Sequence, residues 1–435
     1  MHDALHLSAR AFLTLGLLTV APAAGAHGAF PAVRQLVADP SDANRLWARA
    51  AHGVLTSDDQ GATWRWLCTA AAGYGGTEEP TLALTGNGTA LMAAFHGLLA
   101  SSDHGCGWAL PDALLVGSAP GVAVDAKNAD RVLVLISGGA GGGAFESSLW
   151  QSLDAGATWK ALSPSLDTST LFTGVGLSSS DASRLYLTGS KGGKSVVVRS
   201  DDAGKTWQAP LELATAGTAQ VAAVHPTNPD VVYLRVGGWG TSGSEGAVLH
   251  SGDGAKSFSE VLRKSAPLMG LTLSPDGAKL FAAYGNPRGG VKLDEAALGL
   301  YSATTADHAF TRVHDTPVAC ATFVAGELWA CTSQFDDGFE IGRSSDDGKT
   351  FAPVMELAAL DGPLECAPSS TVGTTCTAAG WDDVCRDIGK CTDTTPAEES
   401  SDDGGCGCRS ARGRAGGALA VLWLALLAAL RRTRR

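Results

Sequence analysis

One short turn is repeated seven times along this chain of 435 residues, at intervals of 42 to 51 residues. Its full form is Ser-x-Asp-x-Gly-x-Thr-Trp, as in the copies that begin at Ser57, Ser152 and Ser200. The copy that begins at Ser344 has phenylalanine in place of the tryptophan. Three degenerate copies begin at Ser101, Ser251 and Ser302. A repeat of about 40–50 residues indicates a propeller or a solenoid.

The residue types of this repeated turn suit a tight reversal that leads into a strand. Serine and aspartate side chains accept hydrogen bonds from backbone N–H groups close by in the turn. Glycine adopts a positive φ without steric cost, and threonine and tryptophan fit the half-buried surface of a strand. The repeated turn therefore predicts the fold much more strongly than it predicts a chemical function.

The repeated turn resembles the Asp-box, or BNR repeat, of sialidases, sortilin-type receptors, xyloglucanase-type glycoside hydrolases and photosystem II assembly factor propellers. The resemblance implies that each box clasps the third strand of a propeller blade to the fourth, away from the ligand-binding face. The residues that would form these clasps are Ser57, Asp59, Gly61, Thr63, Trp64, Asp103, Asp154, Trp159, Asp202, Trp207, Asp253, Asp346, Gly348 and Phe351.

Strand and turn signals within each repeat predict four strands. In the sixth repeat the expected strands are residues 270–274, 279–284, 298–302 and 310–313. Short strands separated by frequent turns, without a long amphipathic helix before the C-terminus, predict an all-β fold. Seven four-stranded antiparallel blades closed into a ring leave only short, protected edges. We therefore predict a seven-bladed β-propeller over residues 27–360.

The N-terminal segment, residues 1–26, resembles a secretory signal peptide. Arg10 ends a weakly basic stretch, residues 11–20 are apolar, and Ala24-Gly25-Ala26 supplies an A-x-A cleavage site. The alternative is a short membrane anchor, but this apolar stretch is too short for a bilayer core of about 30 Å. We therefore expect an exported protein.

The C-terminal segment, residues 406–435, resembles the MYXO-CTERM sorting signal of myxobacterial surface proteins. It contains Cys406 and Cys408 in a Gly-Cys motif, then an apolar stretch at 415–430 expected to be helical, then a basic end. The resemblance implies recognition by a sorting protease and retention at the cell surface. Lipid anchoring, retention through the helix and release all stay open. Residues 393–405 are acidic and predict a disordered stalk.

Ten cysteines in an exported chain favour disulfides over metal ligation. Cys320 and Cys331 would face each other across a hairpin that turns at Ala325-Gly326, so we expect them to pair. We expect Cys68 to pair with Cys106 between neighbouring blades. The four cysteines of a C-terminal knob, residues 361–392, are expected to pair among themselves in one of three connectivities; they are Cys366, Cys376, Cys385 and Cys391. A zinc site in the knob is the alternative, and the lack of C-x2-C spacing disfavours it.

Long connections between the second and third strands of several blades predict a possible ligand face. These connections are residues 137–146, 237–246, 285–297 and 333–339, joined by the connection 70–80 between blades 1 and 2. Loops on a rigid scaffold often carry binding residues, although a tolerant surface also accumulates long loops. The candidate ligand residues are Tyr74, Glu78, Glu79, Trp239, Arg288, Asp336 and Asp337.

Composition and motifs narrow the possible functions. The net charge of -12 and the pI of about 5.3 disfavour nucleic acid as a partner. The chain lacks the Arg-Ile-Pro motif of sialidases, and no metal or cofactor is expected. We predict a monomeric, cell-surface binding or scaffold module for a protein or glycan. The alternative is a secreted sialidase-like or glucanase-like glycoside hydrolase, in which facing carboxylates such as Glu78 and Asp336 would act as acid and base.

Overall fold

The computed structural model describes residues 33–75, 78–162, 166–215, 217–237, 245–285, 293–376 and 378–391. All of these lie in one compact unit, Gly28–Asp393. The predicted signal peptide, the acidic stalk, Cys406, Cys408 and the apolar stretch 415–430 lie outside the described residues. Within the described residues no helix has the length and apolar character needed to cross a membrane.

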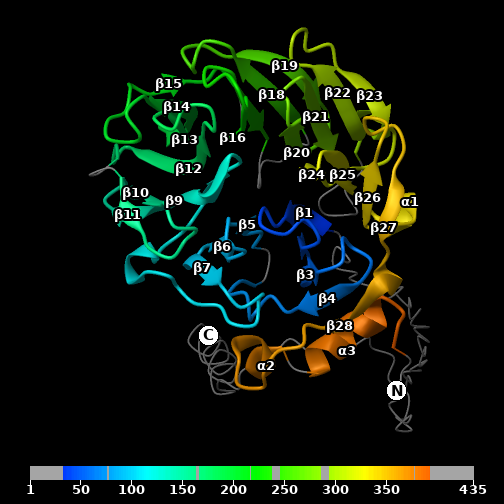
Figure 1. The fold of residues 1–435 in the computed structure, drawn as a ribbon. Coiled ribbons are helices and arrows are strands. Elements are labelled where there is room, and N and C mark those ends of the chain that lie inside the picture. The colour runs from blue at the N-terminus through cyan, green and yellow to red at the C-terminus, as the bar shows by residue number, and fades with distance from the viewer. Residues whose placement is uncertain are drawn as a thin grey trace, which may run out of the picture. The chain divides into compact units, whose positions relative to one another are not determined.

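Seven antiparallel sheets follow one another along the chain and are arranged as the blades of a ring (Figure 1). Blade 1 comprises β1 (Val33–Ala38), β2 (Leu46–Ala50), β3 (Gly53–Ser57) and β4 (Trp64–Leu67). Blade 2 comprises β5 (Thr81–Leu84), β6 (Ala90–Ala94) and β7 (Gly97–Ser101). Blade 3 comprises β8 (Gly121–Asp125), β9 (Asn128–Gly141), β10 (Ala144–Ser152) and β11 (Lys160–Ala161).

The remaining four blades each have four strands. Blade 4 comprises β12 (Thr170–Leu177), β13 (Leu185–Lys191), β14 (Lys194–Ser200) and β15 (Leu211–Glu212). Blade 5 comprises β16 (Ala219–Val224), β17 (Val232–Val236), β18 (Gly246–Ser251) and β19 (Ser259–Lys264). Blade 6 comprises β20 (Leu268–Leu273), β21 (Lys279–Tyr284), β22 (Gly299–Thr304) and β23 (Thr311–His314). Blade 7 comprises β24 (Cys320–Val324), β25 (Glu327–Cys331), β26 (Ile341–Ser344) and β27 (Ala352–Met355).

The first strand of each blade lies innermost and contacts the first strand of the next blade, and β1 contacts β24 to close the circle. Apolar side chains of adjacent blades pack together in the seams. Leu133 and Leu135 of blade 3, for example, share one buried cluster with Leu185 and Leu187 of blade 4. The prediction of a seven-bladed β-propeller is confirmed.

Blade 2 departs from the four-stranded pattern because its outer strand is interrupted. At the position of this strand the chain forms one isolated antiparallel β-bridge, between Ala100 and Ala109. Pro111 follows two residues later and has no N–H to donate to a ladder. The chain then forms a short helix, η1 (Ala113–Leu115), which the Asp112 side chain caps.

The serine and the aspartate of the repeated turn have the same hydrogen bonds in each of its clear copies. In blade 1 the Gly61 N–H donates to the Ser57 hydroxyl oxygen (2.9 Å), and the Asp59 carboxylate accepts the N–H (2.9 Å) and the hydroxyl (2.6 Å) of Thr63. The Trp64 indole N–H donates to the Gly61 carbonyl (2.9 Å). Gly61 has a φ of 89°, which explains glycine at this position. Blade 6 is built differently, because Asp307 accepts from Thr304 and from the Ala309 N–H.

The hairpin of blade 7 has the register that a two-residue turn at Ala325-Gly326 predicts. Val324 lies opposite Glu327, and Cys320 lies opposite Cys331. The two cysteines form a disulfide with a Cα–Cα distance of 4.8 Å. This is the pairing expected from the sequence.

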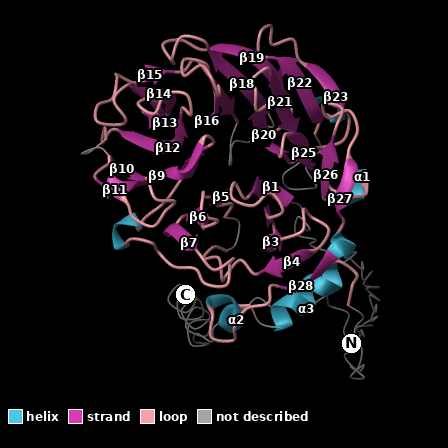
Figure 2. Cartoon of the chain, viewed as in Figure 1, coloured by secondary structure: helices cyan, strands magenta, loops and turns pink. Residues whose placement is uncertain are grey.

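The chain after blade 7 crosses to blade 1 and lies along its outer edge. It forms η3 (Leu357–Ala359) and then β28 (Leu360–Pro363), which pairs in parallel with β4 as a fifth strand. Two helices follow, α2 (Thr371–Thr375) and α3 (Ala378–Asp387), and α3 lies outside β28 (Figure 2). We call residues 360–391 the C-terminal strap.

The disulfides of the strap correct two of the predicted pairings. Cys68 is bonded to Cys376 and Cys106 to Cys366, so the predicted Cys68–Cys106 bond is wrong. Of the four knob cysteines, only Cys385 and Cys391 pair with each other. The physical reason is the path of β28, which pairs with β4 and carries the strap along blades 1 and 2. This path brings Cys376 to Cys68 of blade 1 and Cys366 to Cys106 of blade 2.

Candidate functional site

The meander of each blade divides the connections of the propeller between two faces. The first and third turns of every blade, which include the repeated turns, lie on one face, here called the turn face. The connections between second and third strands, and those between blades, lie on the opposite face, here called the loop face. This division follows from the antiparallel order of the strands.

Three arginines lie near the loop-face ends of strands in blades 1 and 5. Arg34 is near the start of β1, and Arg49 lies near the end of β2. Both are buried, at 8% exposed. Arg235 comes from β17 of blade 5, and its pKa is lowered by burial and by the charge of Arg49. We call Arg34, Arg49 and Arg235 the arginine cluster.

Glu79 lies beside this cluster. Its carboxylate is 3.5 Å from the Arg49 guanidinium, and its side chain is a quarter exposed. Burial lowers the pKa of Arg49 and of Arg34, and the charge of Glu79 opposes both shifts. Glu79 is thus the counter-ion that acts on all three arginines.

Tyr74 was predicted as a ligand residue, but its ring is buried in the core with Trp47 and Leu82. Burial raises the pKa of its phenol well above the usual range, and the nearby Arg49 charge opposes that shift. Neither the Tyr74 hydroxyl nor Arg49 Nε has a hydrogen-bond partner. Both of these donors are therefore buried without an acceptor.

Glu340 joins blade 7 to blade 1 on the loop face. Its carboxylate accepts the Gln334 N–H (3.0 Å) and the Val33 N–H (3.4 Å). Burial raises its pKa to about 7 despite these bonds and the Arg34 charge. The sequence analysis did not single out Glu340, because nothing in the sequence distinguishes it from the exposed acids around it.

The other predicted ligand residues occupy separate positions. Glu78 accepts a hydrogen bond from the Phe95 N–H. Asp336 is exposed on α1 (Gln334–Asp337), whereas Asp337 accepts from the Thr316 hydroxyl (2.6 Å). Glu78 precedes β5 of blade 2, and Asp336 lies in the connection between β25 and β26 of blade 7. Trp239 and Arg288 lie outside the described residues.

One of the predicted long loops is mostly strand. Residues 137–146 of blade 3 continue β9 and β10 as a hairpin that turns at Gly142-Gly143. The glycines in this segment suggested a loop, but the backbone ladder extends through them. The connection 333–339 of blade 7 likewise contains the short helix α1.

The loop face also carries exposed apolar side chains over blade 2, which the sequence analysis did not predict. Phe95 follows β6 and is 66% exposed, and Leu114 of η1 is 65% exposed. Leu110 and Val116 are also exposed and lie around Gly97, which bridges to Val116. We call Phe95, Leu110, Leu114 and Val116 the apolar patch.

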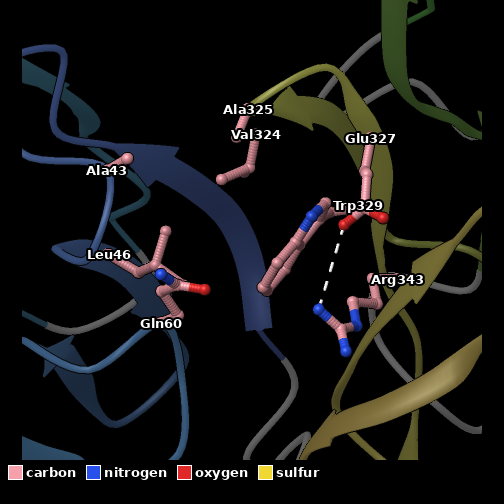
Figure 3. A pocket seen from close by; sticks show the side chains of 8 residues that line it. All are labelled: Ala43, Leu46, Gln60, Val324, Ala325, Glu327, Trp329 and Arg343. Carbon is pink, nitrogen blue, oxygen red and sulfur yellow. Dashed lines mark ion pairs between the residues drawn. The ribbon is translucent and has the colours of Figure 1, made fainter.

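A small pocket lies at the seam of blades 7 and 1 on the turn face (Figure 3). It encloses about 70 Å³ and is lined by Ala43, Leu46, Gln60, Val324, Ala325, Glu327, Trp329 and Arg343. Its polar rim is a loose ion pair between Arg343 and Glu327 at 3.9 Å. Ligand pockets are typically about 300–1,000 Å³, so this one is too small to serve as the main site. No metal-binding group of three or more ligating side chains occurs among the residues that the structure describes.

Comparisons with known proteins show the fold. No protein-family model matches the chain, and no curated protein matches its sequence. Among solved structures it is similar to an ancestral GH74 enzyme, with a TM-score of 0.54 and 18% identity. That match covers 74% of this chain and 46% of the enzyme, so this chain spans less than half of the enzyme's length.

Two further solved propellers are similar to the chain at lower scores. YCF48 from Cyanidioschyzon merolae has a TM-score of 0.48 and 13% identity over 69% of this chain and 92% of that one. The Dos1 propeller has a TM-score of 0.44 and 14% identity over 74% of this chain and 80% of that one. At 18% identity, the match to the GH74 enzyme shows the β-propeller fold alone.

Proposed function

We propose that this protein is a non-catalytic Asp-box propeller displayed on the cell surface, and that it binds another protein through its loop face. The apolar patch carries this proposal. Contiguous exposed apolar side chains on a soluble domain mark interaction sites, and Phe95 and Leu114 are each about two thirds exposed. Phe335 on α1 is a further exposed apolar side chain on the same face.

The hydrogen bonds of the repeated turns support a structural role for the turn face. The Asp59 carboxylate already accepts from Ser57 and from Thr63 within its own turn. Asp154 and Asp202 have the same internal partners. Carboxylates that are occupied in this way have little capacity left for a ligand, in agreement with the clasp role that the Asp-box resemblance implies.

Four disulfides among the described residues are typical of an exported protein. They support the signal peptide that we infer for residues 1–26. Display at the surface through the MYXO-CTERM-like segment 406–435 is part of the same proposal, as is the action of a sorting protease near Cys406.

The test uses full-length protein and two kinds of variant. The double variant Phe95→Ser/Leu114→Ser removes the centre of the apolar patch. The matched control is Leu153→Ser, because Leu153 is 67% exposed but lies in a repeated turn on the opposite face. Proteins cross-linked to the wild type on the producing cell should be lost with the patch variant and retained with the control.

Two results would contradict the proposal. One is that the patch variant still captures the cross-linked proteins whereas Leu153→Ser no longer captures them. The other is turnover of sialosides or β-glucans by the purified protein that disappears in Glu78→Gln or Asp336→Asn. That second result would favour the secreted glycoside hydrolase.

A further inference from the structure

On the turn face, several seams between blades are closed by the glycine of a repeated turn, which lies against an apolar side chain of the preceding blade. These contacts are Gly61 with Val354, Gly105 with Trp47, Gly156 with Leu91 and Gly348 with Leu300. Blade 6 has Ala306 at the position of this glycine, and its turn has other hydrogen bonds. The seam between blades 5 and 6 is therefore closed in another way.

His308 of the blade 6 turn closes this seam against two rings of blade 5. Its Nε2 lies 2.9 Å from the hydroxyl of Tyr233 on β17. Its ring centroid lies 4.4 Å from that of His250 on β18 and 5.7 Å from that of Tyr233. The rings of Tyr233 and His250 also contact each other, with centroids 5.1 Å apart. We call Tyr233, His250 and His308 the histidine seam.

The histidine seam is partly closed to water. Tyr233 is 0% exposed and shares an apolar cluster with Leu280 of blade 6, and both histidines are half-buried. Burial raises the pKa of Tyr233 to about 12, so its phenol keeps its proton at every physiological pH. The hydroxyl of this buried phenol therefore needs an acceptor, and His308 Nε2 is in position to be one.

This arrangement suits uncharged imidazoles. A neutral His308 can accept the Tyr233 proton at Nε2, whereas an imidazolium carries a proton on both nitrogens and can only donate. Two imidazolium rings 4.4 Å apart would also repel each other in a half-buried site. In agreement with this geometry, burial lowers the pKa of both histidines, and the charge of His308 lowers that of His250 further.

Two carboxylates near the histidines act against these shifts. Asp253, in the turn after β18, raises the pKa of His250, and Asp307 raises that of His308. Both carboxylates already accept hydrogen bonds within their own turns. His225 lies at the same end of the seam, against the first turn of blade 6. The effect of burial exceeds that of the carboxylates, since both pKa values stay below the ordinary 6.5.

We propose that the histidine seam is an acid-sensitive joint of the ring, closed at neutral pH and opened when His250 and His308 take up protons. In the open seam both imidazoles meet water, where they bind protons more readily than in the closed one. The closed seam is therefore fully stable above about pH 6.5 and loses stability as the pH falls below that value. The joint lies on the turn face, so it is separate from the binding proposed for the loop face.

The experiment is hydrogen–deuterium exchange of the full-length protein at pH 7.5 and pH 5.0, with each rate divided by the intrinsic rate of that amide at the same pH. The amides of Thr305, His308 and Phe310 report on the joint, because each donates to a backbone carbonyl there. We expect their protection to fall about tenfold at pH 5.0. The repeated turn of blade 3, residues 152–159, contains no histidine, and its protection should not change.

Two variants remove the protonation sites in different ways. His250→Phe keeps an aromatic ring beside Tyr233 but cannot take up a proton. His308→Asn suits the φ of 53° at this position, because asparagine tolerates the left-handed region. In each variant the fall in protection should shrink to less than about threefold. His250→Phe keeps the test available if His308→Asn alters the turn at both pH values.

The matched control is His96→Gln, because His96 is an exposed histidine of blade 2 and its loss should leave the wild-type behaviour unchanged. Three results would overturn the inference. The first is equal wild-type protection of residues 305–310 at pH 7.5 and pH 5.0. The second is that His250→Phe loses as much protection in acid as the wild type. The third is an equal loss in the repeated turn of blade 3, because acid would then loosen the whole ring.

Discussion

Within the repeated turn the serine is buried, whereas the aspartate is half-exposed or exposed, so the two side chains contribute differently to stability. Ser200 is 0% exposed, and its hydroxyl oxygen accepts the Gly204 N–H (2.8 Å) while the hydroxyl donates to Asp202 (2.8 Å). Loss of the serine hydroxyl leaves a buried N–H without a partner. The aspartate can exchange its partners for water at a smaller cost.

We therefore predict that Ser200→Ala lowers the free energy of unfolding by about 1–3 kcal/mol. Chemical denaturation of the full-length protein measures this change. Ser102→Ala is the control, since Ser102 is exposed in the turn of blade 2. Equal stability of the two variants would show that the buried hydroxyl is not the source of the turn's stability.

Glu340 gives the protein a pH dependence near neutrality. Its pKa is raised from the ordinary value of 4.5 to about 7 by burial, so the folded state keeps a proton that the unfolded state has lost. Stability therefore falls as pH rises from about 4.5 to about 7, by roughly 3 kcal/mol in total. Glu340→Gln should be more stable than wild type at pH 8 and similar to it at pH 4.5. Thermal unfolding of both proteins at both pH values tests this. The same stability difference between Glu340→Gln and wild type at pH 8 and at pH 4.5 would contradict it.

At the scale of the element, the C-terminal strap closes a ring whose blades share no strand. β28 pairs with β4, and the Leu364 N–H donates to the Trp66 carbonyl (2.7 Å). Trp381 of α3 packs on Trp66 with ring centroids 5.9 Å apart. The strap thus ties the chain after blade 7 to blade 1, and the Cys106–Cys366 bond extends this tie to blade 2.

The strap disulfide should contribute more than the hairpin disulfide. Cys68 and Cys376 are 308 residues apart, whereas Cys320 and Cys331 are 11 apart, and a longer closed loop restricts the unfolded chain more. We predict a loss of about 3–5 kcal/mol for Cys68→Ser/Cys376→Ser and about 2–3 kcal/mol for Cys320→Ser/Cys331→Ser. Denaturant unfolding of both double variants shows which disulfide contributes more to the free energy of unfolding. The reverse order would mean that the strap does not hold the ring together.

The contrast between these two disulfides also shows what the sequence can predict. The hairpin at Ala325-Gly326 is local, so the register and the cysteine pair follow from counting outward from the turn. The strap pairing depends on β28, whose sequence Leu-Asp-Gly-Pro lacks the pattern of a strand. Nothing local indicates that it would lie along β4 and carry Cys376 to Cys68.

The same limit applies to the candidate site. The strand 279–284 was predicted with the bounds that β21 has, because alternation and a preceding turn define it. Phe95 and Leu114 resemble core residues in sequence, and only the structure shows that they are exposed. Arg49 and Arg235 are 186 residues apart in the numbering, so nothing local in the sequence indicates that the charge of Arg49 acts on Arg235.

At the scale of the whole molecule, the propeller separates its structural face from its proposed binding face. On the turn face, the aspartate of each clear repeated turn accepts hydrogen bonds from within its own turn. The apolar patch and the arginine cluster lie on the loop face, joined by the connection that carries Glu78 and Glu79. A partner that covers the apolar patch would bury aromatic and aliphatic side chains, as the centres of protein interfaces do.

The most direct test of this account is hydrogen–deuterium exchange of full-length protein with and without its captured partner. The account predicts slower exchange at residues 95–97 and 113–116 in the complex, and unchanged exchange in the repeated turn that contains Leu153. Protection confined to the repeated turns, with residues 95–97 and 113–116 unaffected, would contradict it.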